Sequence, residues 1–425
     1  MDQTRSSAAE EAAVAIVGFG TAGVNAAIGL RNAGYDGPIR AFSDAGPQPC
    51  SPIMTSYYVG GGRERQECFP WSAEALADLG VELVGDGRCP VAALDLEARL
   101  VRTERGDFPY SKCVIATGAR PVGAPFPVEG GYEPLVLRTL GDAERMRAAF
   151  AAPTCRRVLV SGASMVALKC VEAALERGLA VTMVGMAEHV LDTCALPVAA
   201  ERFERGLEAS GVELRLGQVV SSVEARGEGA SPRLEVRFSD GSAEGFDEVV
   251  VAHGVRPALG FLAPGALEAD RGLLVDGFMR TSDPDVYAAG DVAQALELVS
   301  GERRVLGIWK TAALQGAVAG AAIAAELAGR EPDAAGAYPG AVMSNTIAVK
   351  GTLFISGGES AAVEGRVVEV REDDAMTVAC IFDQGADGAR RLVGYNVVAD
   401  ADEPGGVAYD TGAMLGLRLE AGCRP

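Results

Sequence analysis

The sequence predicts an α/β protein, and three stretches of the chain carry that prediction. Two of them share one order, in which the short apolar strands Ala13–Val17 and Arg157–Val160 each run into a glycine turn and then a helix. The third is a late turn that contains Gly290 and Asp291. A buried parallel strand followed by glycines and a helix is typical of a dinucleotide site. We therefore expect two Rossmann-like three-layer (ββα) dinucleotide-binding domains plus a small C-terminal α/β domain.

The first glycine turn has the spacing that a pyrophosphate needs. Gly18 permits the tight turn, Gly20 lets the backbone approach the ligand, and Gly23 lets the helix pack on the strand. The following helix, expected over about Thr21–Ala33 with Gly34 as its C-cap, directs its N-terminal amides at the phosphates. The backbone candidates for this site are Gly18, Gly20, Thr21, Ala22 and Gly23.

An acidic residue follows the second expected strand, Pro38–Phe42. This strand ends at Ser43 and Asp44. A carboxylate about twenty residues after the glycine turn meets a ribose hydroxyl in this type of site, so both residues are cofactor-binding candidates.

The second glycine turn departs from the pattern. Only Gly162 keeps its glycine, because Ser164 and Ala167 occupy the other two places. A serine in the second place adds a side chain where a pyrophosphate would approach. The candidates for contact with the nicotinamide nucleotide are Gly162, Ser164, Met165 and Val166.

The next strand, Ala180–Val184, ends at Gly185, where an acid would be expected for NAD, and Glu188 is an alternative ribose contact. No arginine follows to suit the 2′-phosphate of NADP, which favours NADH over NADPH.

Several linked motifs resemble the FAD-dependent pyridine nucleotide (disulfide) oxidoreductase family, in its ferredoxin, rubredoxin and nitrite reductase-like branch. Val114–Pro121 resembles the crossover that returns to the flavin, and Val250–Pro257 resembles the exit from the nicotinamide domain. Thr281–Val292 resembles the second flavin motif, and Trp309 with Gln315-Gly316 resembles an element beside the isoalloxazine ring. The resemblance extends from about residue 12 to about residue 418.

The resemblance implies the cofactors and several site residues. FAD would be approached by Ala116, Thr117 and Gly118 and anchored by Asp291, after the turn at Gly290. The nicotinamide nucleotide would be approached by Gly254. Trp309 and Lys310 would lie beside the flavin, where a lysine charge favours the reduced anionic ring. The implied activity is hydride transfer from NAD(P)H to FAD and electron transfer to a redox partner protein, in a homodimer.

Cys50 is a separate catalytic candidate. One branch of the family carries a redox cysteine in this region, but Cys50 lies about three residues too far from the following Tyr-Val-Gly sequence to align with it. In the ferredoxin reductase pattern Cys50 stands where a tyrosine is found. Cys68 is a weaker candidate, and His253 is interpreted as structural.

Composition excludes some functions. The formal net charge of −20 argues against nonspecific binding to nucleic acid or anionic membranes. The nine cysteines show no zinc spacing, so we expect reduced thiols and no metal. The polar first eleven residues lack a secretory signal, which predicts a cytoplasmic protein, and the apolar stretch Thr311–Ala328 is interpreted as a buried helix, not a membrane span.

The expected domains are discontinuous. Residues 1–120 and 256–330 form the FAD-binding domain, 135–255 the NAD(P)-binding domain, and 335–425 the C-terminal interface domain. Within them we expect one helix over Ala187–Gly211 and another near Gly405–Leu417.

Three functions stay open at this point. The first is an NAD(P)H-dependent flavoprotein reductase that serves a redox partner protein. The second is an NADH oxidase or CoA-disulfide reductase-like enzyme that acts on a small molecule or O2, with Cys50 as a possible disulfide partner. The third is an FAD-binding subunit whose nicotinamide site has decayed, which Ser164, Ala167 and Gly185 favour.

Overall fold

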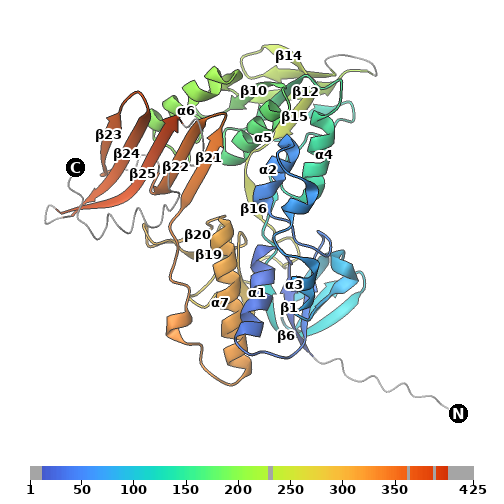
Figure 1. Cartoon of the computed structure of the whole chain (residues 1–425). Coiled ribbons are helices and arrows are strands. Elements are labelled where there is room, and N and C mark those ends of the chain that lie inside the picture. Colours follow the sequence, from blue (N-terminus) through green and yellow to red (C-terminus); the bar gives the residue numbers. More distant parts are fainter. Residues whose placement is uncertain (1–11, 228–232, 361–363, 386–388, 401–425) are drawn as a thin grey trace. The chain divides into compact units, whose positions relative to one another are not determined.

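A computed structural model describes residues 12–227, 233–360, 364–385 and 389–400 of the chain (Figure 1). The residues form two compact units. Unit 1 contains Met1–Ser51, Phe69–Arg120 and Arg256–Ala341, and unit 2 contains Pro52–Cys68, Pro121–Val255 and Val342–Pro425. Two short strands, β7 (Ala119–Pro121) and β16 (Val255–Pro257), lie where the chain passes from one unit to the other.

Unit 1 is built on a parallel sheet. The strands follow the order β3-β2-β1-β6, and β18 also pairs with β6. Their bounds are β1 (Ala13–Val17), β2 (Ile39–Phe42), β3 (Val81–Leu83), β6 (Gly106–Ile115) and β18 (Val286–Ala288). Val17 at the end of β1 lies beside Phe42 on one side and Ile115 on the other. The carboxyl ends of these strands therefore share one edge of the sheet, where open α/β sheets bind ligands.

Shorter strands extend the first unit. The amino-terminal half of β6 continues into an antiparallel ladder with β5 (Leu100–Thr103), which pairs with β4 (Val91–Asp95). A separate three-stranded sheet contains β17 (Leu273–Leu274), β19 (Ala293–Leu296) and β20 (Arg303–Arg304). Apolar and polar residues alternate over Glu97–Tyr110, which is typical of such strands.

Two helices of unit 1 pack backbone against backbone. They are α1 (Thr21–Asn32) and α7 (Trp309–Leu327), drawn side by side in Figure 1. A Cβ on Gly316 would lie 2.2 Å from the carbonyl oxygen of Ala22, and one on Gly320 would lie 2.1 Å from that of Ala26. The glycines of α7 are thus what lets the two helices approach so closely. The remaining helical segments are α3 (Ala73–Ala77), η2 (Val84–Gly87) and η3 (Ala334–Gly336).

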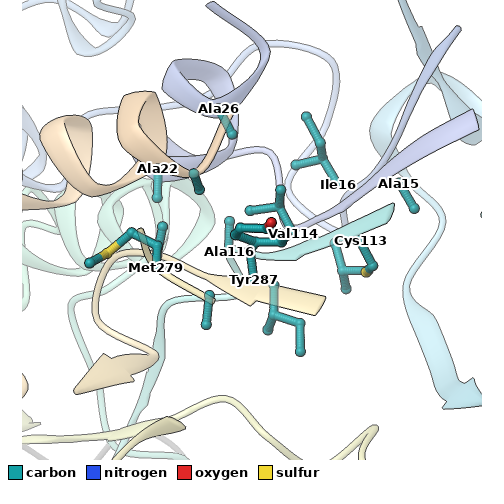
Figure 2. Packing of buried hydrophobic residues seen from close by; sticks show 14 of the residues in the cluster. Ala15, Ile16, Ala22, Ala26, Cys113, Val114, Ala116, Met279 and Tyr287 are labelled. Atoms are coloured by element: carbon teal, nitrogen blue, oxygen red, sulfur yellow. The ribbon is translucent and has the colours of Figure 1, made fainter. Parts of the chain in front are cut away.

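Small side chains of α1 also contribute to the hydrophobic core of unit 1. Figure 2 shows Ala22 and Ala26 of α1 close to residues of the strands, among them Val114 of β6 and Tyr287 of β18. Tyr287 and Val114 are fully buried. The core of unit 1 therefore fixes α1 and the carboxyl end of β6 in one rigid frame.

Unit 2 repeats the parallel arrangement. Its four-stranded sheet has the order β11-β10-β9-β15. The strands are β9 (Arg157–Ser161), β10 (Ala180–Gly185), β11 (Val212–Leu216) and β15 (Glu248–Val251), and the helices are α4 (Leu140–Phe150), α5 (Met165–Glu176) and α6 (Pro197–Ala209). A second sheet contains β8 (Val128–Glu129), β12 (Val220–Ala225), β13 (Leu234–Phe238) and β14 (Ala243–Phe246).

The segment after Cys50 belongs to unit 2, although the sequence places it within the first part of the FAD-binding domain. It forms α2 (Pro52–Gly60) and η1 (Arg65–Cys68). Helix α2 is tied to α4 and to the residue after α5 by side chains, because Arg147 donates to the carbonyl of Tyr58 at 2.9 Å and Arg177 donates to that of Val59 at 2.9 Å. Stacking of Arg147 on the Tyr58 ring adds to this contact.

The C-terminal residues that the structure describes form an antiparallel sheet on α6. Its order is β21-β22-β25-β24-β23. The bounds are β21 (Ser344–Val349), β22 (Thr352–Gly358), β23 (Val367–Glu372), β24 (Met376–Gln384) and β25 (Arg390–Asp400). Phe203 of α6 meets Phe354 of β22 edge to face at 6.1 Å. The helix expected near Gly405–Leu417 lies outside the described residues.

One expected helix is shorter than its pattern indicates. The prediction of a helix over Ala187–Gly211 is wrong for its first half, because α6 begins at Pro197. A proline inside a helix removes a hydrogen bond and clashes with the preceding turn, whereas the first helical position tolerates it. Residues 187–196 instead form turns, with Leu191 at a φ of 58°.

Among the residues that the structure describes, no helix combines the length and the apolar character that a membrane crossing requires.

Candidate dinucleotide sites

The glycine turn after β1 is a set of close backbone contacts. Gly18 has a φ of 97°, and a Cβ there would lie 2.3 Å from the carbonyl oxygen of Ala116. A Cβ on Gly23 would lie 2.1 Å from the carbonyl oxygen of Gly18. Both positions require glycine, because backbone atoms cannot move aside as side chains do.

The middle glycine of this turn is free of such contacts. A Cβ on Gly20 would meet nothing within 4 Å. Gly20 is also the N-cap of α1, and no side chain caps that helix. The first amides of α1, including those of Thr21 and Ala22, therefore have no side-chain cap, and the positive end of the helix dipole lies behind them. This cradle fits the pyrophosphate of FAD.

The expected ribose ligands lie at the end of β2. Ser43 is buried, and its hydroxyl accepts a hydrogen bond from the amide of Ala45 at 3.1 Å. The exposed carboxylate of Asp44 pairs with Arg120 at 3.4 Å. Asp44 is thus accessible to a ribose, and Arg120 is a neighbouring cation that sequence reasoning did not single out.

The turn after β6 lies against the glycine turn. The amide of Ala116 donates to the carbonyl of Val17 at 2.7 Å, which extends the parallel ladder to the edge. The Thr117 hydroxyl donates to the carbonyl of Ala258 at 2.9 Å, and the amide of Ala258 donates to the carbonyl of Gly118 at 2.9 Å. The structure therefore brings residues 116–118 together with Gly18 at the switch point between β1 and β6.

The late glycine–aspartate turn is anchored by α7. The amide of Gly290 donates to Oε1 of Gln315, which is 2% exposed, at 2.8 Å. A Cβ on Gly290 would lie 3.1 Å from the Cβ of Ala22, so this turn adjoins the first turn of α1. Asp291 follows directly and is partly exposed. In the sequence Gln315 is recognisable only as part of a motif, and its anchoring role is visible only in the structure.

The two tryptophans of the chain meet near the start of α7. The rings of Trp71 and Trp309 are stacked, with centroids 6.2 Å apart and planes inclined by 27°. Trp309 is the first residue of α7, and its Nε1 is buried without a hydrogen-bond partner. Lys310 is exposed. A buried donor without a partner fits a site that a polar ligand completes.

Cys50 is a partly buried thiol outside any disulfide, near the end of the first segment of unit 1. Its Sγ donates to the carbonyl of Ser51 at 3.6 Å. Cys68, in unit 2, is a buried thiol outside any disulfide. Other thiols of unit 2 are inert by burial, which raises the pKa of Cys170 to about 12.

The second glycine turn keeps one of the two close contacts. Gly162 has a φ of 125°, and a Cβ there would lie 2.4 Å from the carbonyl oxygen of Ala252. Ser164 differs from Gly20, because its hydroxyl caps α5: it accepts from the amide of Ala167 at 3.4 Å and donates to the carbonyl of Ala252 at 3.2 Å. The serine thus occupies part of the helix terminus. Met165 and Val166 form the first turn of α5.

The end of β10 is crowded at its last residue. A Cβ on Gly185 would lie 2.8 Å from the Cβ of Ala163, which explains why no acid stands there. Lys169 of α5 donates to Glu172 at 2.7 Å and to the Tyr57 hydroxyl at 3.2 Å. Gly254, at a φ of 87°, follows His253 after β15.

Among the residues that the structure describes, no group of histidine, cysteine, aspartate or glutamate side chains is arranged to hold a metal ion.

Comparisons with known proteins agree with this geometry. Residues 12–316 match the family described as pyridine nucleotide-disulphide oxidoreductase. The chain is 30% identical over 360 residues to the NADH-dependent phenylglyoxylate dehydrogenase subunit epsilon of Aromatoleum evansii, which covers 84% of this chain and 82% of that protein. It is 30% identical over 299 residues to the rubredoxin-NAD(+) reductase of Pseudomonas putida, covering 68% of this chain and 74% of that protein.

The fold also matches solved structures. The water-forming NADH oxidase from Lactobacillus brevis bound to NADH superimposes with a TM-score of 0.82 over 97% of this chain and 90% of that one, at 20% identity. Similarity at that identity shows a shared fold and no more. Together with the family match, these comparisons show that the chain belongs to the pyridine nucleotide-disulphide oxidoreductase family and is an FAD-dependent NAD(P)H oxidoreductase.

Proposed function

We propose that this chain transfers electrons between NADH and a redox partner protein through bound FAD. The observation that carries the proposal is the uncapped start of α1 under Gly20, beside the turns at Ala116–Gly118 and Gly290. This arrangement holds a dinucleotide at the switch point of unit 1. The choice of acceptor is supported by the relatives at 30% identity, which are named as a rubredoxin-NAD(+) reductase and as a subunit of an NADH-dependent dehydrogenase.

The residues of the chain bind and orient; the chemistry is that of the cofactor. When bound, FAD accepts a hydride from the nicotinamide ring and releases single electrons. The amides of Thr21 and Ala22 hold its pyrophosphate, Asp44 its adenosine ribose, and Asp291 its ribityl end. Thr117 and Gly118 bring the backbone close to the ring system, and Trp309 stacks on Trp71 at the start of α7. Lys310 is exposed and places a positive charge at that helix terminus.

NADH is the proposed nucleotide, and unit 2 is the proposed place of its binding. Gly162, Met165, Val166 and Gly254 supply backbone at the switch point between β9 and β15. The end of β10 is Gly185, which offers no positive charge to the 2′-phosphate of NADP.

The assembly and location are part of the same proposal. The edge strand β23 exposes Val368 and Val370, at 41% and 46%, which favours a homodimer through the C-terminal sheet. Sedimentation velocity tests the dimer. The eight cysteines of the described residues form no disulfide with one another, which favours the reducing cytoplasm.

An anaerobic titration tests the main proposal. The oxidised yellow protein is titrated with NADH and, separately, with NADPH, while the visible absorbance of the flavin is followed. We expect rapid bleaching by NADH and reoxidation of the flavin by an added rubredoxin or ferredoxin. If neither nucleotide bleaches the flavin while dithionite still reduces it, unit 2 has a scaffold role instead. The cap that Ser164 places on α5 would agree with that outcome.

A second candidate function uses Cys50. Reduction of a small disulfide needs a thiol that exchanges with the substrate, and Cys50 is a partly buried thiol outside any disulfide. The variant Cys50→Ser separates the candidates, because a disulfide reductase loses its activity while NADH-driven reduction of a partner protein is unchanged. Cys380→Ser, at a partly exposed thiol of the C-terminal sheet, is the matched control.

A further inference from the structure

The turns after β6 and after β15 are equivalent in sequence and geometry. Residues 116–121 read Ala-Thr-Gly-Ala-Arg-Pro, and residues 252–257 read Ala-His-Gly-Val-Arg-Pro. Each turn lies against a glycine turn, because a Cβ on Gly18 would meet the carbonyl of Ala116 at 2.3 Å and one on Gly162 would meet that of Ala252 at 2.4 Å. His253 therefore takes in unit 2 the position that Thr117 takes in unit 1, at the switch point of the parallel sheet.

A hydrogen bond and an aromatic contact fix the imidazole of His253. Its Nε2 lies 2.8 Å from the hydroxyl of Ser161, a residue 2% exposed at the end of β9. The ring of Phe126 meets the imidazole edge to face at 6.3 Å. The glycine turn also lies close to the imidazole, because a Cβ added to Gly162 would lie 3.4 Å from Cδ2 of the ring.

These neighbours carry no charge. Ser161, Gly162 and Phe126 face the ring from β9, the glycine turn and the segment before β8. His253 itself is exposed, and partial desolvation by these neighbours is the one cause of its lowered pKa. Residues 161–167 and 252–254 contain neither lysine nor arginine, so His253 is the one side chain of these residues that can become a cation, and Arg256 follows later, in β16.

The N-terminus of α5 has fewer free amides to bind an anion than the N-terminus of α1. The amide of Ala167 is taken by the hydroxyl of Ser164, whereas α1 starts at Gly20 without a side-chain cap. The pyrophosphate of a nicotinamide dinucleotide carries two negative charges and finds one fewer free amide here than in unit 1. A donor on the opposite turn would compensate for that loss.

We propose that His253 is a positioning residue that donates a hydrogen bond to the nicotinamide dinucleotide in unit 2 and takes up a proton when the nucleotide binds. This inference rests on the proposed binding of NADH by unit 2. The imidazole keeps Ser161 on Nε2 and offers Nδ1 to the phosphate or to the adjoining ribose oxygen. The anionic ligand raises the pKa of the imidazole in the complex above its value in the free protein, and the difference appears as proton uptake.

Isothermal titration calorimetry measures that uptake without turnover. The oxidised FAD-loaded protein is titrated with NAD+ at pH 6.5 in two buffers of different ionisation enthalpy, PIPES and Bis-Tris. We expect uptake of roughly half a proton per site, because the free imidazole is mostly neutral at this pH and the bound one is not. Dissociation constants measured from pH 5.5 to pH 8.5 should increase with pH.

The variant His253→Gln keeps a hydrogen-bond donor that cannot titrate. We expect its proton uptake to vanish and its dissociation constant for NAD+ at pH 6.5 to rise about tenfold, the loss of a charged hydrogen bond. His253→Thr, which reproduces the residue of the first turn, is the second variant and should behave in the same way. FAD content and the far-UV spectrum show that either variant is folded.

Two outcomes would overturn the inference, and they differ in what else they remove. If the parent binds NAD+ and both variants show the same uptake and affinity, His253 has no contact with the nucleotide, while NADH binding by unit 2 stands. If the parent protein does not bind NAD+ at all, the proposed nicotinamide site is lost together with the role of His253.

Discussion

The amide of Gly290 donates to the side-chain oxygen of Gln315 at 2.8 Å, so a side chain of α7 holds the turn that follows β18. Gln315 is 2% exposed, so the hydrogen bond is shielded from bulk solvent. The relationship connects the late glycine–aspartate turn with the helix that packs on α1. A buried amide that loses its acceptor is costly, and this turn is where Asp291 is positioned.

Gln315→Ala should therefore lower both stability and FAD retention. We expect the free energy of unfolding to fall by about 1–3 kcal/mol, because the amide of Gly290 is left without an acceptor. Urea unfolding and the ratio of flavin to protein absorbance measure the two effects. Gln315→Glu keeps an acceptor and should retain FAD better, and Leu314→Ala, at a partly exposed neighbour, is the surface control. Equal FAD content in Gln315→Ala and the parent would contradict the anchoring role.

Gly20→Ala should release FAD from a folded protein. Its Cβ meets nothing within 4 Å of the chain, and the φ of −87° is allowed for alanine, so the apoprotein should unfold at nearly the parent's urea concentration. The methyl group instead enters the space through which the pyrophosphate approaches the backbone. Flavin content after gel filtration is the measurement.

Two other glycines serve as controls for that result. Gly23→Ala should destabilise the apoprotein itself, because its Cβ would lie 2.1 Å from the carbonyl of Gly18. Gly34→Ala has a φ of 86° and open space around it, so we expect a loss of about 1 kcal/mol with normal FAD content. A destabilised Gly20→Ala apoprotein would show that the turn is packed rather than open.

The first site was predictable because its rules are local. Gly18, Gly20 and Gly23 follow a buried strand at a fixed spacing, and each spacing corresponds to one backbone requirement. The N-terminus of α1 and the parallel neighbours of β1 follow from the same pattern. Gln315 could be named only by its motif, because its contact with Gly290 depends on two elements that are 25 residues apart.

The second site was harder, because one residue type has two local meanings. A serine in place of the second glycine indicates a side chain that blocks the pyrophosphate. Serine is also a favoured N-cap residue, and the Ser164 hydroxyl accepts a hydrogen bond from the amide of Ala167. The start of α6 could have been predicted from Pro197, because proline is favoured at the first position of a helix. The apolar stripe that extends upstream of it favoured an earlier start. The crowding of Gly185 by Ala163 is tertiary and has no sequence signal.

Glu326 should make the stability of unit 1 depend on acid pH. The carboxylate accepts from Lys112 at 2.6 Å and pairs with Arg280. Burial alone would raise its pKa, but the charged hydrogen bonds from Lys112 and Arg280 outweigh burial and hold the pKa below the usual 4.5. Because the folded pKa lies below the unfolded value, the stabilisation is present above about pH 4.5 and is lost as the pH falls through the folded pKa.

The variant Glu326→Gln should lack that part of the pH dependence. At pH 7 we expect its free energy of unfolding to be lower by about 1–3 kcal/mol, since Lys112 loses a charged acceptor. The difference from the parent should shrink between pH 5 and pH 3.5, as measured by urea unfolding at each pH. Glu331→Gln, at an exposed residue, should follow the parent throughout. A constant difference down to pH 3.5 would assign the effect to packing instead of charge.

Ser164→Gly should strengthen nucleotide binding by unit 2. The substitution frees the amide of Ala167 and reproduces the uncapped terminus of α1, so we expect the dissociation constant for NAD+ to fall several-fold. Glycine at an N-cap costs only a few tenths of a kcal/mol, whereas Ser164→Ala should lose about 1 kcal/mol of stability. Calorimetry on the oxidised protein gives the affinity, and thermal unfolding gives the stability. Ser72→Gly is the matched control, because the Ser72 hydroxyl caps α3 by accepting from the amide of Ala75 at 3.1 Å. This variant should leave NAD+ binding unchanged. Weaker binding by Ser164→Gly would mean that the serine hydroxyl itself contacts the nucleotide.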